Sequence, residues 1–264
     1  MKKQDKTEFE ALLEVMARLR GADGCPWDRE QDHASLKPFL LEEAYEALEA
    51  IDEGDDGELC KELGDVLLQV VFHAQIAAEE QRFTMAEVCR AIVDKMIRRH
   101  PHVFGSTKVE NADQVLSNWE QIKRSERREA APAPSALDGV PRQLPALLRA
   151  QRLQDKAARL GFDWPDIEGP LDKIEEELAE LKKARADGEA AAIEAEFGDL
   201  LFSLVNVGRF LGLCPEEALR QGAAKFERRF RSLEERFAAA GNEIEAASLE
   251  EMDRVWDQIK ETER

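Results

Sequence analysis

The sequence is poor in features typical of oxidised and membrane-spanning proteins. Its 264 residues include four cysteines, and no two of them form a C-x-x-C pair, so we expect reduced, mostly structural thiols. It has no uninterrupted apolar stretch of about 18 residues and no apolar leader segment after its first residues. We therefore expect a cytoplasmic protein that does not span a membrane.

Basic residues are also under-represented. Lysine and arginine total 37 against 56 aspartates and glutamates, which gives a formal net charge of −19. This charge excludes broad binding to a nucleic-acid polymer or an anionic membrane, because both need a basic surface. Aromatic residues make up 6% and charged residues 35% of the chain. Together with its alanine, glutamate, leucine and arginine content, this composition predicts an almost entirely α-helical protein.

Two further absences restrict the chemistry. The chain has neither a G-x-x-x-x-G-K-[ST] loop nor a G-x-G-x-x-G loop, so any nucleotide must be held by metal and side chains. The histidines, His33, His73, His100 and His102, all lie in the first half. A metal site present in both halves must therefore use oxygen ligands, which favour Mg²⁺ or Mn²⁺ over zinc or copper.

Acidic residues form one pattern twice, at a constant offset of 134 residues. The first copy is Glu43, Glu46, Glu62 and Asp65, and the second is Glu177, Glu180, Glu196 and Asp199. Residues three apart on a helix share a face, and each quartet is symmetric about a turn glycine, Gly54 or Gly188. Folding back at that glycine brings the acidic pairs level. Facing carboxylates repel by about 1 to 4 kcal/mol per close pair, so we expect a cation between them.

The duplication predicts two domains. A proline- and alanine-rich stretch, 130–141, separates the copies and is typical of a linker. We expect one helical domain at 1–129 and another at 142–264. Each should contain a lead helix, an antiparallel acidic hairpin, a third helix and a last helix, so the fold class is all-α with two tandem repeats.

Cationic and aromatic residues are duplicated with the acids. Lys225 and Arg229 lie one helical turn apart, as do Trp256 and Lys260. Their counterparts in the first copy are Lys95, Arg99, Trp119 and Lys123. A basic face can simply be solvated and paired with glutamates, and a tryptophan at helical spacing can simply be core. Beside a metal-binding acid cluster, the same residues suit a polyphosphate and a stacked base.

These motifs resemble a known family. The Glu42-Glu43-x-x-Glu46 and Glu62-x-x-Asp65 motifs, with their second copies, resemble the E-E-x-x-E and E-x-x-D motifs of the all-α nucleoside triphosphate pyrophosphohydrolases. The two-copy layout resembles the MazG family, with a Cys25-Pro-Trp-Asp28 run before the first hairpin and an Arg99-His-Pro-His-Val-Phe104 run after it.

The resemblance implies a hydrolase that cleaves nucleoside triphosphates, broadly over ribo- and deoxy forms, into a monophosphate and diphosphate. It implies that Glu177, Glu180, Glu196 and Asp199 hold Mg²⁺, or Mn²⁺, and carry the catalysis. It also implies that Lys225 and Arg229 grip phosphates, that Trp256 and Lys260 border the nucleotide, and that the first-copy residues have the same roles. A homodimer that completes the helical bundles is a further family expectation.

The two copies are not identical around the cations. Lys95 follows Asp65 by 30 residues, whereas Lys225 follows Asp199 by 26. Pro101 also ends the helix just after Arg99. We therefore expect the second copy to be the main active site and the first to be a second or structural site. Two alternatives stay open: a non-catalytic acidic interaction module, and a house-cleaning pyrophosphatase specific for one nucleotide.

Overall fold

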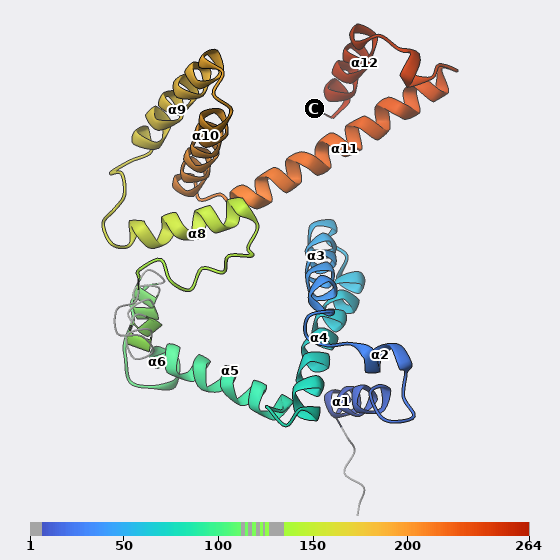
Figure 1. Cartoon of the computed structure of the whole chain (residues 1–264), viewed down its shortest axis with the longest axis vertical. Coiled ribbons are helices and arrows are strands. Elements are labelled where there is room, and N and C mark those ends of the chain that lie inside the picture. The colour runs from blue at the N-terminus through green and yellow to red at the C-terminus, as the bar shows by residue number, and fades with distance from the viewer. Residues whose placement is uncertain are drawn as a thin grey trace, which may run out of the picture. The chain divides into compact units, whose positions relative to one another are not determined.

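The computed structural model describes residues 7–111, 114–115, 118–119, 122–123, 125–126 and 135–263. Every regular element in these residues is a helix, and none is a strand (Figure 1). The all-α fold class is therefore confirmed. The chain divides into two compact units, Met1–Glu129 and Ala130–Arg264, and each is described by itself.

The core of the first unit lies beside the second half of its longest helix. The helices are α1 (Glu8–Leu19), α2 (Pro26–Glu30), α3 (Lys37–Glu53), α4 (Asp56–Glu79), α5 (Met85–Arg99) and α6 (Pro101–Phe104). Val71, Phe72 and Ile76 of α4 pack with Met16 of α1 and with Leu36, which precedes α3. This cluster fixes the start of α3 against the end of α4. The acidic residues therefore lie on the part of the hairpin nearer its turn.

Both hairpins turn at a glycine in the left-handed backbone region. Gly54 ends α3 with φ 69° and Gly188 ends the corresponding helix of the second unit with φ 76°, a conformation that glycine adopts without steric cost. In the first hairpin, the Asp55 carboxylate accepts hydrogen bonds from the backbone N–H groups of Gly57 and Glu58 and so caps α4. The expected antiparallel acidic hairpins are therefore present in both units.

The second unit repeats the hairpin and adds a long third helix. Its elements are α8 (Ala146–Ala158), α9 (Glu168–Asp187), α10 (Ala190–Phe210), α11 (Pro215–Ala239), the short 3₁₀ helix η1 (Ile244–Ala246) and α12 (Leu249–Thr262). The α9–α10 hairpin packs on α8, and α8 also contacts α11. Leu233 and Phe237 of α11 form a separate small core with Ile259 of α12. Helix α12 is thus held by α11 (Figure 1).

Two expected segments lie partly outside the described residues. The helix expected to follow α6 includes several residues that are not described, but its described positions 114–115, 118–119, 122–123 and 125–126 are helical. Residues 130–134 of the expected linker are not described, and residues 135–141 contain turns and no helix.

No single helix in the described part of the chain has the length and apolarity needed to cross a membrane. Helices α10 and α11 pass the same test of length and composition only as a pair, and they are bent by 103° where they meet.

Candidate metal and nucleotide site

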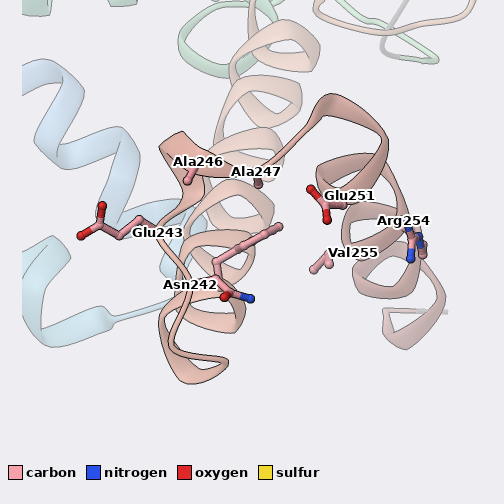
Figure 2. A pocket seen from close by; sticks show the side chains of 8 residues that line it. Asn242, Glu243, Ala246, Ala247, Glu251, Arg254 and Val255 are labelled. Atoms are coloured by element: carbon pink, nitrogen blue, oxygen red, sulfur yellow. The ribbon is translucent and has the colours of Figure 1, made fainter.

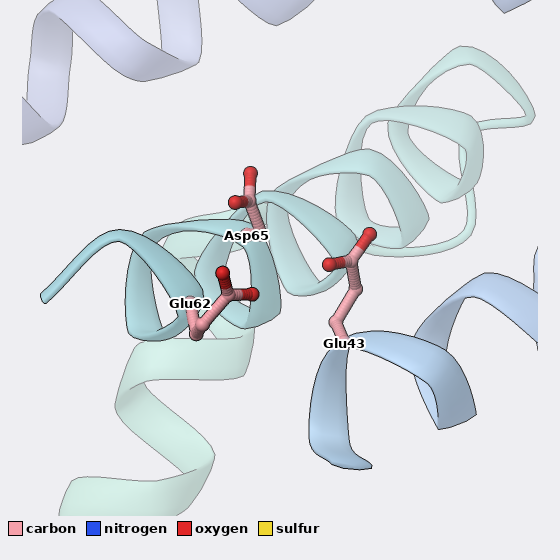
Figure 3. Close-up of side chains that lie close together, drawn as sticks. All are labelled: Glu43, Glu62 and Asp65. Atoms are coloured by element: carbon pink, nitrogen blue, oxygen red, sulfur yellow. The ribbon is translucent and has the colours of Figure 1, made fainter. Parts of the chain in front are cut away.

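The first acid cluster joins the two helices of the first hairpin. Glu43 of α3 and Glu62 and Asp65 of α4 each place one carboxylate oxygen within 4.8 Å of the others. The three side chains are half-buried and point toward a common centre (Figure 3). Burial and then the Asp65 charge raise the pKa of Glu43 above its usual range. The first hairpin therefore concentrates negative charge that an added cation would stabilise.

An amide group adjoins this cluster. The Gln69 side chain is 6% exposed, and its Nε2 donates a weak hydrogen bond to Glu43 Oε1 over 3.4 Å. Its Oε1 is buried and has no hydrogen-bond partner among the described residues. An amide oxygen is a normal ligand of a hard cation. The first cluster thus offers three carboxylates and one neutral oxygen.

The second acid cluster has the same geometry but contains a built-in cation. Glu177 of α9 and Glu196 and Asp199 of α10 place carboxylate oxygens within 4.8 Å of one another. The Glu177 side chain is 5% exposed, and Lys173 Nζ lies 2.6 Å from its Oε1. A second contact, 2.9 Å long, joins Lys173 to Glu176. These carboxylates raise the pKa of Lys173 and keep its ammonium charged.

The fourth acid of each quartet lies close to its cluster. Burial is the largest cause of the raised pKa of Glu62, and the Glu46 charge comes next. Burial likewise raises the pKa of Glu196, followed by the Glu180 charge, and Lys173 partly offsets the rise. Glu46 and Glu180 are not members of the three-residue clusters. The structure thus brings three of the four expected acids of each copy to one point and keeps the fourth within electrostatic range.

The donor set fits a divalent cation. Each cluster offers oxygen ligands from two facing helices, and neither includes a histidine or a cysteine. Such ligands suit Mg²⁺ or Mn²⁺. The second cluster must exchange Lys173 for the cation or bind it with the other carboxylates, whereas the first has no lysine among its three members.

The expected phosphate and base ligands of the second unit lie on α11 and α12. Arg229 is paired with Glu263 at 2.6 Å and Lys260 with Asp257 at 2.7 Å. Trp256 packs against Phe226 and the small α11–α12 core. Lys225, on α11, is exposed.

The acid cluster and these cations are held by different helices. In the described part of the chain, no hydrogen bond or ion pair joins any of Lys225, Arg229, Trp256 and Lys260 to the acids. Helix α12 packs on α11 and η1 precedes it, while the acid hairpin packs on α8. A single chain therefore does not bring the two sets together.

The first unit builds a different cationic group. Arg99 pairs with Glu126 at 2.6 Å and lies over the Trp119 ring, with Cζ 5.9 Å from the ring centroid. Lys123 Nζ is 3.9 Å from the same centroid. The hydrogen bond from Arg99 lowers the pKa of Glu126 to about 2. Three of the expected ligands thus come together, while Lys95 is half-buried on α5.

A pocket elsewhere in the second unit contains none of the expected site residues. It lies between the end of α11, η1 and α12, and its lining includes Asn242, Glu243, Glu251, Arg254 and Val255 (Figure 2). Glu251 is already committed to the N-cap of α12 through Ser248. This pocket is separate from the acid clusters.

Three residues at the sites were not among those expected. Lys173 precedes Glu177 by one helical turn, and Gln69 follows Asp65 by one turn. This spacing is visible in the sequence and, for residues four apart, predicts contact on a helix. The pairing of Arg99 with Glu126 spans 27 residues, and no local pattern indicates it.

Comparison with known proteins agrees with this geometry. Residues 31–104 match the family model described as the MazG nucleotide pyrophosphohydrolase domain. The chain is 49% identical over 259 residues to the nucleoside triphosphate pyrophosphohydrolase of Escherichia coli (strain K12), covering 97% of this chain and 98% of that protein. It is 48% identical over 252 residues to the nucleoside triphosphate pyrophosphohydrolase/pyrophosphatase MazG of Thermotoga maritima, covering 96% and 95%. The crystal structure of a mazG-related protein from Thermotoga maritima matches 44% of this chain and 98% of its own, with 28% identity and a TM-score of 0.38.

The helices and the paired clusters define an all-α protein with two acidic hairpins suited to divalent cations. With near full-length identity to curated relatives, the chain belongs to the MazG family of nucleoside triphosphate pyrophosphohydrolases. The resemblance drawn from its motifs is confirmed.

Proposed function

We propose that this protein hydrolyses nucleoside triphosphates between the α and β phosphates, giving a nucleoside monophosphate and diphosphate. The observation that carries the proposal is the convergence of Glu177, Glu196 and Asp199 at one point between α9 and α10. The near full-length identity to the Escherichia coli relative, whose name states this activity, supports the reaction type.

The reaction requires charge neutralisation at the phosphates and an activated water. A bound Mg²⁺, or Mn²⁺, would supply both by contacting phosphate oxygens and lowering the pKa of a bound water. Glu177, Glu196 and Asp199 hold the cation, and Glu180 completes the set. Glu177 or Glu180 orients the attacking water and receives its proton. The leaving group is diphosphate.

Lys225 and Arg229 are proposed to grip the phosphates, and Trp256 and Lys260 to border the nucleotide. Arginine offers a planar fork and lysine a point charge to phosphate oxygens. These contacts do not depend on which base is present, which supports breadth over ribo- and deoxynucleoside triphosphates.

A second copy of the chain is proposed to complete the site. On α10, Phe197, Leu201 and Leu204 share one helix face and are 53%, 38% and 48% exposed, and Leu178 of α9 is 39% exposed. An apolar face of this kind on a two-helix hairpin is typical of half a four-helix bundle. A second hairpin would bury it and could bring α11 and α12 of the other copy near the acids. All four cysteines are free, which suits a reducing compartment and supports a cytoplasmic location.

The first cluster is proposed as a second cation site with a weaker phosphate grip. Its counterparts of the phosphate ligands are already engaged, since Arg99 holds Glu126 and Lys123 lies over Trp119. Turnover would therefore be carried mainly by the second copy.

Product analysis tests the proposal. The full chain is incubated with ATP and Mg²⁺, and phosphorus NMR identifies the products, with a chelator as the metal control. AMP and diphosphate are expected, while ADP and orthophosphate would contradict the proposed bond. Absence of both hydrolysis and metal-dependent nucleotide binding would favour the non-catalytic module. A rate survey over bases and sugars separates a broad enzyme from one specific for a single nucleotide.

A further inference from the structure

The two acid clusters differ at one duplicated position. Lys173 on α9 and Phe39 on α3 are separated by the same 134 residues that relate the two acid quartets. Lys173 places its ammonium 2.6 Å from Glu177. Phe39 instead packs edge-on against Trp27, with ring centroids 5.7 Å apart, and joins the core of the first unit. The second cluster therefore carries its own counter-ion at this position, and the first carries a hydrophobic ring.

The lysine occupies an oxygen that a metal would need. Glu177 has a nearly buried side chain, and such a carboxylate is costly to leave without a positive partner. A divalent cation that binds Glu177 Oε1 must therefore displace Lys173. The displaced ammonium then needs a new anionic partner, which only one further contact, Glu176 at 2.9 Å, supplies in part. Metal entry at the second cluster is consequently a cation exchange.

The first cluster has an oxygen available where the second has a small hydroxyl. Gln69 is 6% exposed, contacts Glu43 and leaves its buried Oε1 without a partner among the described residues. At the same offset the second copy has Ser203. The unpartnered amide oxygen points to a ligand at the first cluster, independently of the carboxylates.

We propose that Lys173 makes cation binding at the second cluster conditional on the substrate, whereas the first cluster binds a divalent cation unaided. Without nucleotide, the Lys173 ammonium occupies Glu177. When a nucleoside triphosphate arrives with its cation, the cation takes the carboxylate and the polyphosphate becomes the new partner of Lys173. The charges balance because an ammonium leaves the carboxylate as a dication enters with a polyanion. This inference rests on the proposed function only in taking a polyphosphate as the ligand that releases Lys173.

Mn²⁺ binding to the full chain tests the inference without turnover. Paramagnetic resonance counts bound Mn²⁺ first without nucleotide and then with an α,β-imido triphosphate, in which the scissile bridge is blocked. We expect about one tight ion per chain without nucleotide and a second only with the analogue. Glu62→Gln should remove the first ion and Glu196→Gln the second. Two equivalent ions per chain in the absence of nucleotide would overturn the inference.

The lysine itself is tested in a chain whose first cluster is disabled by Glu62→Gln. Adding Lys173→Met should strengthen nucleotide-free Mn²⁺ binding at the second cluster by on the order of tenfold, whereas Lys173→Arg should leave it weak because the charge is kept. Unchanged Mn²⁺ affinity in the methionine variant, with an unchanged melting curve, would contradict the role given to Lys173.

Phe39→Lys is the matched change in the first copy. It should weaken the nucleotide-free ion there, and its thermal melt shows whether the core still holds. Should it unfold, the Lys173 pair of variants decides alone. Because these readouts count ions, absence of hydrolysis would overturn the proposed function without affecting them.

Discussion

Arg229 on α11 directs two nitrogens at one carboxylate oxygen of Glu263 at the end of α12. Its Nε and Nη2 lie 2.7 and 2.6 Å from Glu263 Oε2, and this contact lowers the pKa of the Glu263 carboxyl. The guanidinium proposed to grip phosphates is therefore already bound to an anion. A phosphate that uses Arg229 must compete with Glu263.

Removing that competitor should strengthen substrate binding. For Glu263→Gln we expect KM for ATP to fall by about two- to fivefold, since the lost pair is solvent-exposed and modest in strength, while kcat changes little. Steady-state kinetics of diphosphate release measure both constants. Glu261→Gln removes the same charge from the same helix without that contact and should leave KM unchanged. A higher KM in Glu263→Gln would show that the pair positions Arg229 instead of competing for it.

A histidine pair in the first unit predicts the response of stability to pH. His33 Nδ1 lies 2.7 Å from His73 Nδ1, and Arg82 contacts His33 Nε2. Arginine always donates, so His33 is neutral, its Nδ1–H donates to His73, and His73 accepts. Burial, followed by His33, lowers the pKa of His73 below 6.5. The unfolded chain then binds the proton first, so stability is retained above that pH and lost as the pH falls below it.

Thermal melts check the direction. Between about pH 7.5 and 5.5 the melting temperature of the first unit should fall by a few degrees. His73→Gln cannot titrate and should show a smaller fall over the same range. Equal falls in both proteins would exclude this pair as the source.

The apolar face of the second hairpin should hold the assembly together. Leu204→Glu places a charge on a face that the proposed second copy buries, so we expect dissociation, measured by light scattering after size-exclusion chromatography, and loss of activity. Leu249→Glu changes an equally apolar residue that is 77% exposed at the start of α12 and should leave the assembly intact. A monomeric wild-type protein, or an unaffected assembly in Leu204→Glu, would contradict the proposed dimer.

The local architecture was readable from the sequence because its determinants are local. The three-residue acid spacing and the turn glycines Gly54 and Gly188 depend on helix geometry and backbone freedom, and both hairpins form as expected. Lys173 and Gln69 were equally local but lie outside the acidic repeat, because each occurs in one copy only. Their importance appears once burial is known.

The remaining contacts depend on how helices distant in sequence pack. The Arg229–Glu263 pair joins residues 34 apart on two helices, and the Trp119 environment joins α5 to a later helix. Helical periodicity states which face a residue occupies, but it does not state which helix covers that face. The sequence therefore identified the cationic residues without showing what holds them in a single chain.

A matched pair of variants tests the central claim most directly. Glu196→Gln and Glu62→Gln remove equivalent carboxylates from the second and first clusters, and diphosphate release from ATP with saturating Mg²⁺ is measured for each beside the wild type. We expect Glu196→Gln to lose at least about a hundredfold in rate and Glu62→Gln to retain most of it. Full activity in Glu196→Gln, or a loss confined to Glu62→Gln, would contradict the assignment of catalysis to the second hairpin.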